Sequence, residues 1–392
     1  MNNCRFNEHN SYSTKLVGVG ACRMASIVFL AIVTVFGGEA AGQQTIETTQ
    51  QLKTACENNA GNVVVLNQAT KILYGPRYPF TEEVLTRCTI ILGPGAKLET
   101  EQISMAFAGP LVIQSTQETD LKLTRTFLSA NSVHLNLPAD SSSVEMSFSQ
   151  LDASVGALLV TMGDQGKLTV KNRLVPGPLE ALTAATTVQI RGGSQLTAEL
   201  SEMRISAPQG IDISMNGAEG LLKISTAWLT AEEGNIGISS SVAKGSVDLS
   251  STNLVVGNSA SLRLTGSDSQ VKLQQVGILG VPDAPPALGG ILIETGVDGE
   301  GGSIEVSDSG FYNAAFLTIR ASANGPKGGL KIQKSNLIPS GDIVLETGPQ
   351  GQTEVKENYG SSPTRLRIAT GAGGSCLAQQ NSITAPVMQV CQ

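Results

Sequence analysis

Between residues 98 and 337 the chain repeats one short pattern: an apolar residue, any residue, an apolar residue, four spacers and a further apolar residue. Ten copies begin at Leu98, Leu121, Val144, Leu168, Leu196, Leu222, Val247, Val271, Ile304 and Leu330. These starts lie 23 to 33 residues apart. A unit this short cannot enclose a hydrophobic core by itself, so successive units must stack on one another.

The elements inside each unit are predicted to be strands. Apolar residues alternate with other residues in the repeat itself and again in a downstream stretch, from Leu111/Ile113 to Leu366/Ile368. Gly, Asn, Asp, Ser and Pro separate these stretches, as turns require. Only residues 46–58, ahead of the repeats, read as a helix. Two to three short strands per 25-residue turn predict an all-β fold, a right-handed parallel β-helix of about 10–11 coils. Immunoglobulin-like domains in tandem would need about 90 to 100 residues per unit.

A column of exposed residues supports this register. The residue after the first apolar position of each repeat is expected to face solvent and to stack on its counterpart in the next coil. This column reads Glu99, Lys122, Glu145, Thr169, Thr197, Lys223, Asp248, Lys272, Glu305 and Lys331. Opposite charges alternate along much of it, which is favourable where neighbouring strands lie about 4.8 Å apart.

The N-terminus has the pattern of a secretory signal peptide. An uncharged apolar run, residues 24–36, follows Lys15 and Arg23 and precedes small residues that include Ala40 and Gly42. We therefore expect residues 1–42 to be removed and the protein to be secreted, periplasmic or on the cell surface. An N-terminal membrane anchor or a buried segment is the alternative. No later run reaches the roughly 18 apolar residues of a membrane span, so no stable span is expected after cleavage.

Four cysteines remain after this cleavage, one pair near each end of the mature chain. Pairing Cys56 with Cys88 and Cys376 with Cys391 is the most economical of the three possible connectivities in an oxidising compartment. Both pairs lie outside the repeat phase. We therefore expect an N-terminal cap over residues 43–92, the β-helix over 93–370 and a disulfide-pinned C-terminal cap over 371–392. Such caps would block end-to-end association, and we expect a monomer.

Two repeats carry extra residues, at 176–187 and 280–290, both expected just before the second alternating stretch. Loops of this kind on a solenoid often bind a partner, and they are also tolerated as plain surface insertions.

Few residues are candidates for chemistry. The net charge is −7, which argues against a nucleic-acid partner. Of the two histidines, His9 precedes the cleavage point and His134 is expected on the surface. Asp140 and Asp164 each lie four residues before a repeat start, so they should stack one coil apart as a weak catalytic carboxylate pair; their place in turns favours local hydrogen bonding to the backbone instead. Asp298, in a glycine-rich acidic turn, is a weak Ca²⁺ candidate. No cofactor is expected.

On this coil periodicity, residues 90–370 resemble the secreted right-handed parallel β-helix superfamily that includes pectate lyases, polygalacturonases, phage tailspikes and adhesin stalks. The resemblance implies a protein that acts on or binds acidic polysaccharides. No catalytic signature accompanies it: the polygalacturonase sequences Asn-Thr-Asp, Asp-Asp, Gly-His-Gly and Arg-Ile-Lys do not occur.

Two functions remain open. The first is an exported non-catalytic β-helix that acts in binding, adhesion or cell-envelope structure, with a polysaccharide or a surface protein as partner. The alternative is a polysaccharide lyase, hydrolase or epimerase with an atypical carboxylate site. The scarcity of histidine and the alternating charges favour the first. The single tryptophan, Trp228, and the scattered tyrosines argue against a stacking groove along the rod.

Overall fold

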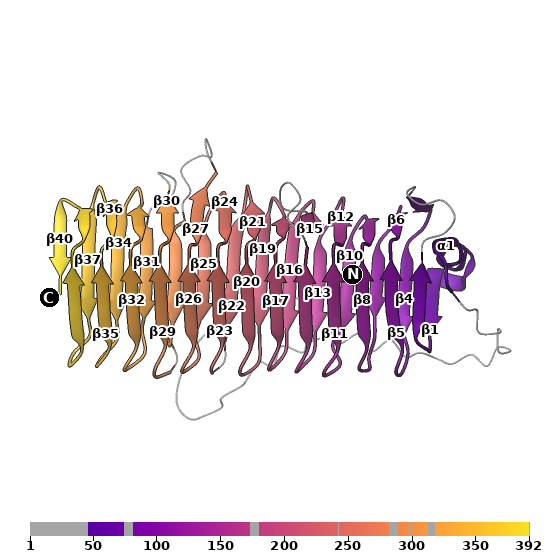
Figure 1. Ribbon diagram of the computed structural model, residues 1–392, viewed down its shortest axis with the longest axis horizontal. Coiled ribbons are helices and arrows are strands. Elements are labelled where there is room, and N and C mark those ends of the chain that lie inside the picture. The colour runs from indigo at the N-terminus through magenta and orange to yellow at the C-terminus, as the bar shows by residue number, and fades with distance from the viewer. Residues whose placement is uncertain are drawn as a thin grey trace, which may run out of the picture. The chain divides into compact units, whose positions relative to one another are not determined.

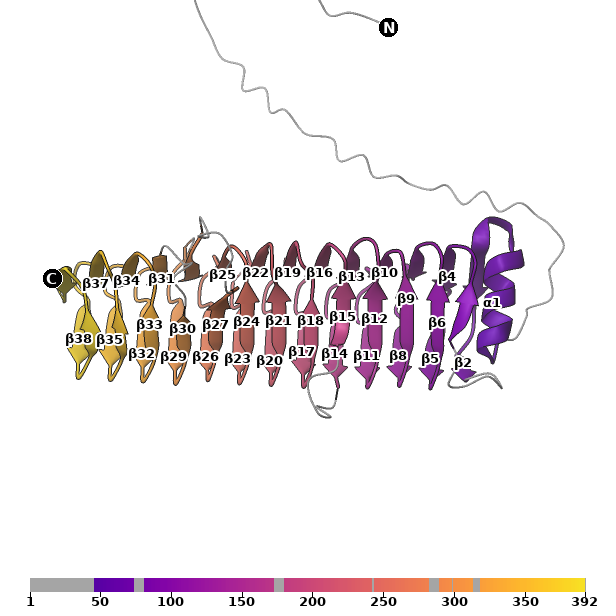
Figure 2. The same cartoon turned by 90° about the horizontal axis from the view of Figure 1, so that it is seen from above.

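Three parallel sheets run side by side along the repeat region, and each coil of the chain adds one strand to each sheet (Figures 1 and 2). The computed structural model describes residues 46–73, 81–172, 180–241, 243–281, 289–297, 299–312 and 318–391. Over these residues the sheets contain 14, 13 and 13 strands. The architecture is an all-β parallel β-helix, as the repeat predicted.

The sheets are named A, B and C. Sheet A contains β2 (Thr70–Leu73), β5 (Lys97–Glu101), β8 (Asp120–Thr124), β11 (Ser143–Ser147), β14 (Lys167–Lys171), β17 (Thr197–Ser201), β20 (Leu221–Ser225), β23 (Ser246–Ser250), β26 (Gln270–Gln274), β29 (Ser303–Ser307), β32 (Gly329–Gln333), β35 (Gln352–Lys356) and β38 (Ser375–Gln379). Sheet B contains β1 (Val63–Leu66), β4 (Cys88–Leu92), β7 (Leu111–Gln114), β10 (Val133–Leu137), β13 (Leu158–Met162), β16 (Thr187–Gly192), β19 (Gly210–Met215), β22 (Asn235–Ser240), β25 (Ala260–Leu264), β28 (Ile291–Thr295), β31 (Thr318–Ala323), β34 (Asp342–Thr347), β37 (Arg365–Thr370) and β40 (Val387–Val390). Sheet C contains β3 (Glu82–Val84), β6 (Ser104–Phe107), β9 (Phe127–Ala130), β12 (Gln150–Ala153), β15 (Glu180–Ala184), β18 (Arg204–Ser206), β21 (Trp228–Ala231), β24 (Asn253–Val256), β27 (Gly277–Gly280), β30 (Gly310–Tyr312), β33 (Asn336–Ile338), β36 (Tyr359–Ser361) and β39 (Ser382–Thr384).

The inner side chains of all three sheets form one continuous core, because alternate residues of a strand point to opposite faces. In β11, for example, Val144 and Met146 are buried while Glu145 between them is exposed. The core extends from Ile46 to Ile383. Each coil therefore buries its apolar residues against the coils on either side, as the shortness of the repeat requires.

The corner between sheets A and C is made by single residues with positive φ, such as Thr226 at 52° and Lys334 at 51°. The residue that follows points inward and is polar in several coils. Asn358 shows why: its Nδ2 donates to the carbonyl oxygen of Ile332 at 3.0 Å, and its Oδ1 accepts from the backbone N–H of Ser335 at 2.9 Å. Such side chains satisfy backbone groups that leave the ladder at the bend.

The N-terminal end is covered by α1 (Thr49–Asn58), followed by the short η1 (Ala60–Asn62). Thr48 and Gln51 form a capping box at the start of the helix. The buried face of α1 includes Leu52 and Cys56, and the helix packs against β1, β3 and β4. Figure 1 shows α1 at the indigo end of the solenoid, beyond β1. The predicted helix is thus present, three residues shorter at its start.

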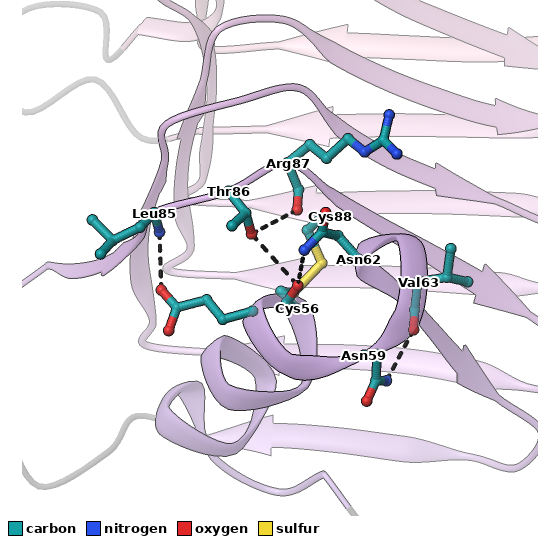
Figure 3. Close-up of a disulfide and its surroundings, with 9 residues drawn as sticks. Cys56, Asn59, Asn62, Val63, Leu85, Thr86, Arg87 and Cys88 are labelled. Atoms are coloured by element: carbon teal, nitrogen blue, oxygen red, sulfur yellow. Dashed lines mark hydrogen bonds between the residues drawn. A yellow bond between two sulfur atoms is a disulfide. The ribbon is translucent and has the colours of Figure 1, made fainter.

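Both disulfides have the predicted pairing, Cys56–Cys88 and Cys376–Cys391. The first joins α1 to β4. Around it, the carbonyl oxygen of Cys56 accepts hydrogen bonds from Asn62 Nδ2 and Thr86 Oγ1 (Figure 3). The second joins an inward position of β38 to the residue after β40, so it closes the last coil.

The coils extend beyond the repeats visible in the sequence. Residues 63–92, placed in the expected N-terminal cap, already include β1 to β4, and residues 375–390, placed in the expected C-terminal cap, form β38 to β40. At the C-terminal end the inward positions hold Cys376 and Ala378, which hide the apolar pattern. The sheets therefore have 13 or more strands where 10–11 coils were expected.

One coil has a different register from the predicted one. Ala198 aligns with Leu168, and Glu199 aligns with Thr169, so Thr197 does not belong to the exposed column. Leu196, the expected start, is buried at the preceding corner. The repeat pattern placed Leu196 and Ala198 at the two inward positions, whereas the strand uses Ala198 and Leu200.

Candidate functional site

Asp140 and Asp164 lie in turns at the same corner of adjacent coils. Asp164 acts as a turn residue: its Oδ1 accepts from the backbone N–H of Ser194 in the next coil at 2.7 Å, and its carbonyl oxygen accepts from the N–H of Ser141 at 2.8 Å. This hydrogen bond is what the turn interpretation of Asp164 requires, and it engages one of the two carboxylate oxygens.

The other predicted positions are dispersed. His134 lies on the outer face of sheet B between Val112 and Leu159 of the neighbouring strands. Asp298 lies outside the described residues, as do residues 176–179 of the first insertion and 282–288 of the second. Residues 180–184 of the first insertion form β15. The insertions also occupy different corners. The first begins before β15 of sheet C, whose inward residue Leu182 pairs with Leu151, and the second lies before β28 of sheet B.

The exposed column of sheet A, corrected for register, alternates in charge over twelve strands with one neutral position. It reads Lys71, Glu99, Lys122, Glu145, Thr169, Glu199, Lys223, Asp248, Lys272, Glu305, Lys331 and Glu354. Pairs such as Lys331–Glu305 are 3.9 Å apart and exposed, so each contributes roughly 0–1 kcal/mol. A face in which each charge has an opposite neighbour offers no concentrated charge for a ligand.

Sheet C has the opposite character towards its C-terminal end. We name the outward side chains of β21, β24, β27, β30, β33 and β36 the uncharged face, because these six strands contain no Lys, Arg, Asp or Glu. Two rows make up this face. The first row is Trp228, Asn253, Gly277, Gly310, Asn336 and Tyr359. The second row is Thr230, Val255, Leu279, Tyr312 and Ile338.

Three exposed aromatic residues share this face although they lie on different, non-adjacent strands. Trp228 and Tyr359 stand at the two ends of the first row, and Tyr312 lies in the second row between them. Their relative exposures are 37%, 59% and 40%, so each ring has a side open to solvent. The aromatic residues are spread over several coils, as expected, but these three lie on the same sheet face.

Local contacts fix the positions of two of these rings. The guanidinium of Arg204, on β18, lies 5.9 Å from the centre of the Trp228 ring, a cation–π distance. Tyr312 Oη accepts a hydrogen bond from Asn336 Nδ2 at 2.7 Å. A Cβ added to Gly310 would lie 2.1 Å from Cε2 of Tyr312, which means that the Tyr312 ring rests over the glycine. Glycine at 310 therefore lets this ring lie across the face.

A separate pocket of about 260 Å³ lies where sheet C turns into sheet B. Its lining includes Gln189, Gln209 and Asn235 around Asp212, its one carboxyl group. Partial burial raises the pKa of Asp212 above its usual value, and the nearby charge of Arg191 opposes this only in part. Glycosidases that work by the usual mechanism need two carboxyl groups, so this pocket lacks half of such a site.

Asp212→Asn is expected to stabilise the folded protein at neutral pH. Because the folded-state pKa is raised, the folded chain holds the proton more tightly than the unfolded chain, and stability falls as the pH rises from the ordinary value of about 3.9 through the folded pKa. Asparagine does not titrate, so the variant does not lose stability in this pH range. Thermal unfolding should therefore show a higher Tm for the variant at pH 7, with the difference reduced at pH 3. A lower Tm at pH 7 would show that the carboxylate has a stabilising contact.

Neither a metal centre nor a membrane helix is found in the ranges that the structure covers. No group of three or more His, Cys, Asp or Glu side chains there could hold a metal ion. Within the same ranges, no helix is long and apolar enough to cross a membrane. Compared with known proteins, the chain matches no family model, no curated protein and no solved structure.

Proposed function

We propose that this protein is an exported, non-catalytic β-helix that binds polysaccharide through the uncharged face of sheet C. The observation that carries the proposal is that Trp228, Tyr312 and Tyr359 are all exposed on the same face of the solenoid. Aromatic side chains with one open side present a large rigid surface to a ligand and lose little conformational entropy on binding.

The disulfides and the signal-like N-terminus support export. Both cysteine pairs are oxidised, which is typical of secreted and periplasmic proteins. A binding role is favoured over catalysis because Asp212 is alone in its pocket and Asp164 is engaged in a turn.

The test is retention of the mature protein, residue 43 onward with its disulfides intact, on insoluble neutral and acidic polysaccharides. We expect retention on at least one of them, and a loss of about tenfold or more in Trp228→Ala/Tyr359→Ala. Two lost stacking contacts at roughly 0.5–1.5 kcal/mol each give a factor of this size.

Phe148→Ala is the matched control, because Phe148 is an exposed aromatic residue at a corner outside the uncharged face. It should be retained like the parent protein. Equal retention of the Trp228/Tyr359 variant, or no retention of the parent on any polysaccharide, contradicts the proposal. Release of new reducing ends or unsaturated products would show an enzyme instead.

A further inference from the structure

The uncharged face is unusual within this molecule. In the same coils, sheet A carries the alternating column from Lys223 to Glu354, and sheet B carries Arg263, Glu294 and Arg320 on its outer face. Charged residues of both signs return only at the edges of the uncharged face: Arg204 lies beside Trp228, and Asp308 and Lys334 lie at the corners next to β30 and β33. A long acidic polymer is normally held by Lys or Arg side chains along its length. This face offers none, so its charge suits a neutral ligand.

The first row is arranged symmetrically along the axis. Its order is an aromatic ring, an asparagine, two glycines, an asparagine and an aromatic ring, from Trp228 to Tyr359. Five strand spacings separate the two ends, or about 24 Å at about 4.8 Å each. The distance between adjacent strands is close to the length that one sugar adds to an extended β-linked chain. A chain of about six sugars laid along the row would therefore reach from one ring to the other.

The middle of the first row consists of glycines and asparagines, so it is polar and has no bulky side chains of its own. A Cβ on Gly277 would lie 2.4 Å from Asn253 Oδ1, so the asparagine amide leans over this glycine, as the Tyr312 ring leans over Gly310. The floor of the row thus consists of amide groups and one aromatic ring. Amides donate and accept hydrogen bonds without charge, which suits sugar hydroxyl groups, while rings contact the apolar faces of sugars.

From these features we infer that the ligand is a neutral, extended, β-linked glycan lying along the solenoid axis from Trp228 to Tyr359. This inference rests on the proposed function and goes further, because it specifies the charge, the shape and the direction of the bound chain. A second copy of this protein is the rival occupant, since Val255, Leu279 and Ile338 form an apolar ridge beside the row.

The test is isothermal titration of the mature oxidised protein with soluble oligosaccharides of matched length. Cellohexaose is neutral and extended, maltohexaose has the same composition but coils, and hexagalacturonate is acidic. We expect cellohexaose to bind at least tenfold more tightly than the other two, with little dependence on salt. Cellobiose should bind at least tenfold more weakly than cellohexaose, because it cannot reach both rings.

Gly310→Ala gives an independent test of the geometry. The added methyl group should displace the end of the Tyr312 side chain, which can move, and leave the fold intact. We expect affinity for cellohexaose to fall severalfold with an unchanged Tm. Phe148→Ala should again change neither value.

Each other outcome overturns the inference in a distinguishable way. Preferred, salt-sensitive binding of hexagalacturonate, or equal binding of maltohexaose, overturns the inference and leaves the proposed function standing. Retention on insoluble polysaccharide without oligosaccharide binding also overturns only the inference. A dimer in solution that Ile338→Asp dissociates, with no glycan bound in any assay, overturns both.

Discussion

Replacing Phe311 with alanine is expected to lower the free energy of unfolding by about 3–5 kcal/mol. Phe311, on β30, is 1% exposed and among the largest fully buried side chains described in the core. Its removal leaves a cavity that the adjoining coils can fill only in part, because their backbones are held by the ladders on both sides. Urea unfolding followed by circular dichroism measures the loss.

The matched control is the next residue along the chain. Tyr312 points to solvent from the same strand and is 40% exposed, so Tyr312→Ala should cost less than about 1 kcal/mol. The two variants thus separate a core position from a surface position on one strand of three residues. Similar losses for both would contradict the register of β30 and the placement of Tyr312 on the uncharged face.

Removing the Cys56–Cys88 disulfide is expected to destabilise the protein by about 3.7 kcal/mol, from the loop entropy that a bridge between residues 32 apart removes from the unfolded chain. Local opening should add to this effect. The bridge ties α1 to β4, and α1 packs against β1 and β3, the first strands of sheets B and C. If α1 detaches, these edges become free to pair with other chains. Cys56→Ala/Cys88→Ala should therefore aggregate on mild heating, as measured by light scattering.

The other disulfide provides the comparison. Cys376→Ala/Cys391→Ala removes a bridge between residues 15 apart, with an expected cost of about 3 kcal/mol. This bridge holds no helix in place. Its loss should therefore destabilise the last coil but should not expose a strand edge that is covered in the parent protein. Aggregation of both variants to the same degree would contradict the capping role of α1.

The repeat predicted the fold because the inward positions of most coils hold Val, Ile or Leu. It failed where those positions hold smaller residues, as at Ala198, or where an insertion moves the next strand, as at Leu182 in β15. The C-terminal end of the solenoid was missed because the inward positions of β38 hold Cys376 and Ala378. The period alone does not determine register across such sites.

The uncharged face of sheet C could not be predicted, because it depends on the strand register across the insertions. Trp228 and Tyr359 are 131 positions apart, and the segments 282–288 and 313–317 intervene, so counting residues cannot place both side chains in one row. Only the strand pairing from β21 to β36 does so. The absence of charged residues from these six strands was a signal that the sequence did contain. It becomes visible once the strands of sheet C are read as a set.

The alternating column of sheet A bears on how such a chain can change in length during evolution. Loss or duplication of a single coil would set two like charges against each other at the join, for example Lys223 next to Lys272 if β23 were lost. Loss or duplication of two coils together preserves the order of signs. Thr169, which occupies the place of a cation between Glu145 and Glu199, is a neutral point where this rule is relaxed. The order of charges is therefore preserved when coils are added or lost in pairs and broken when one is added or lost alone.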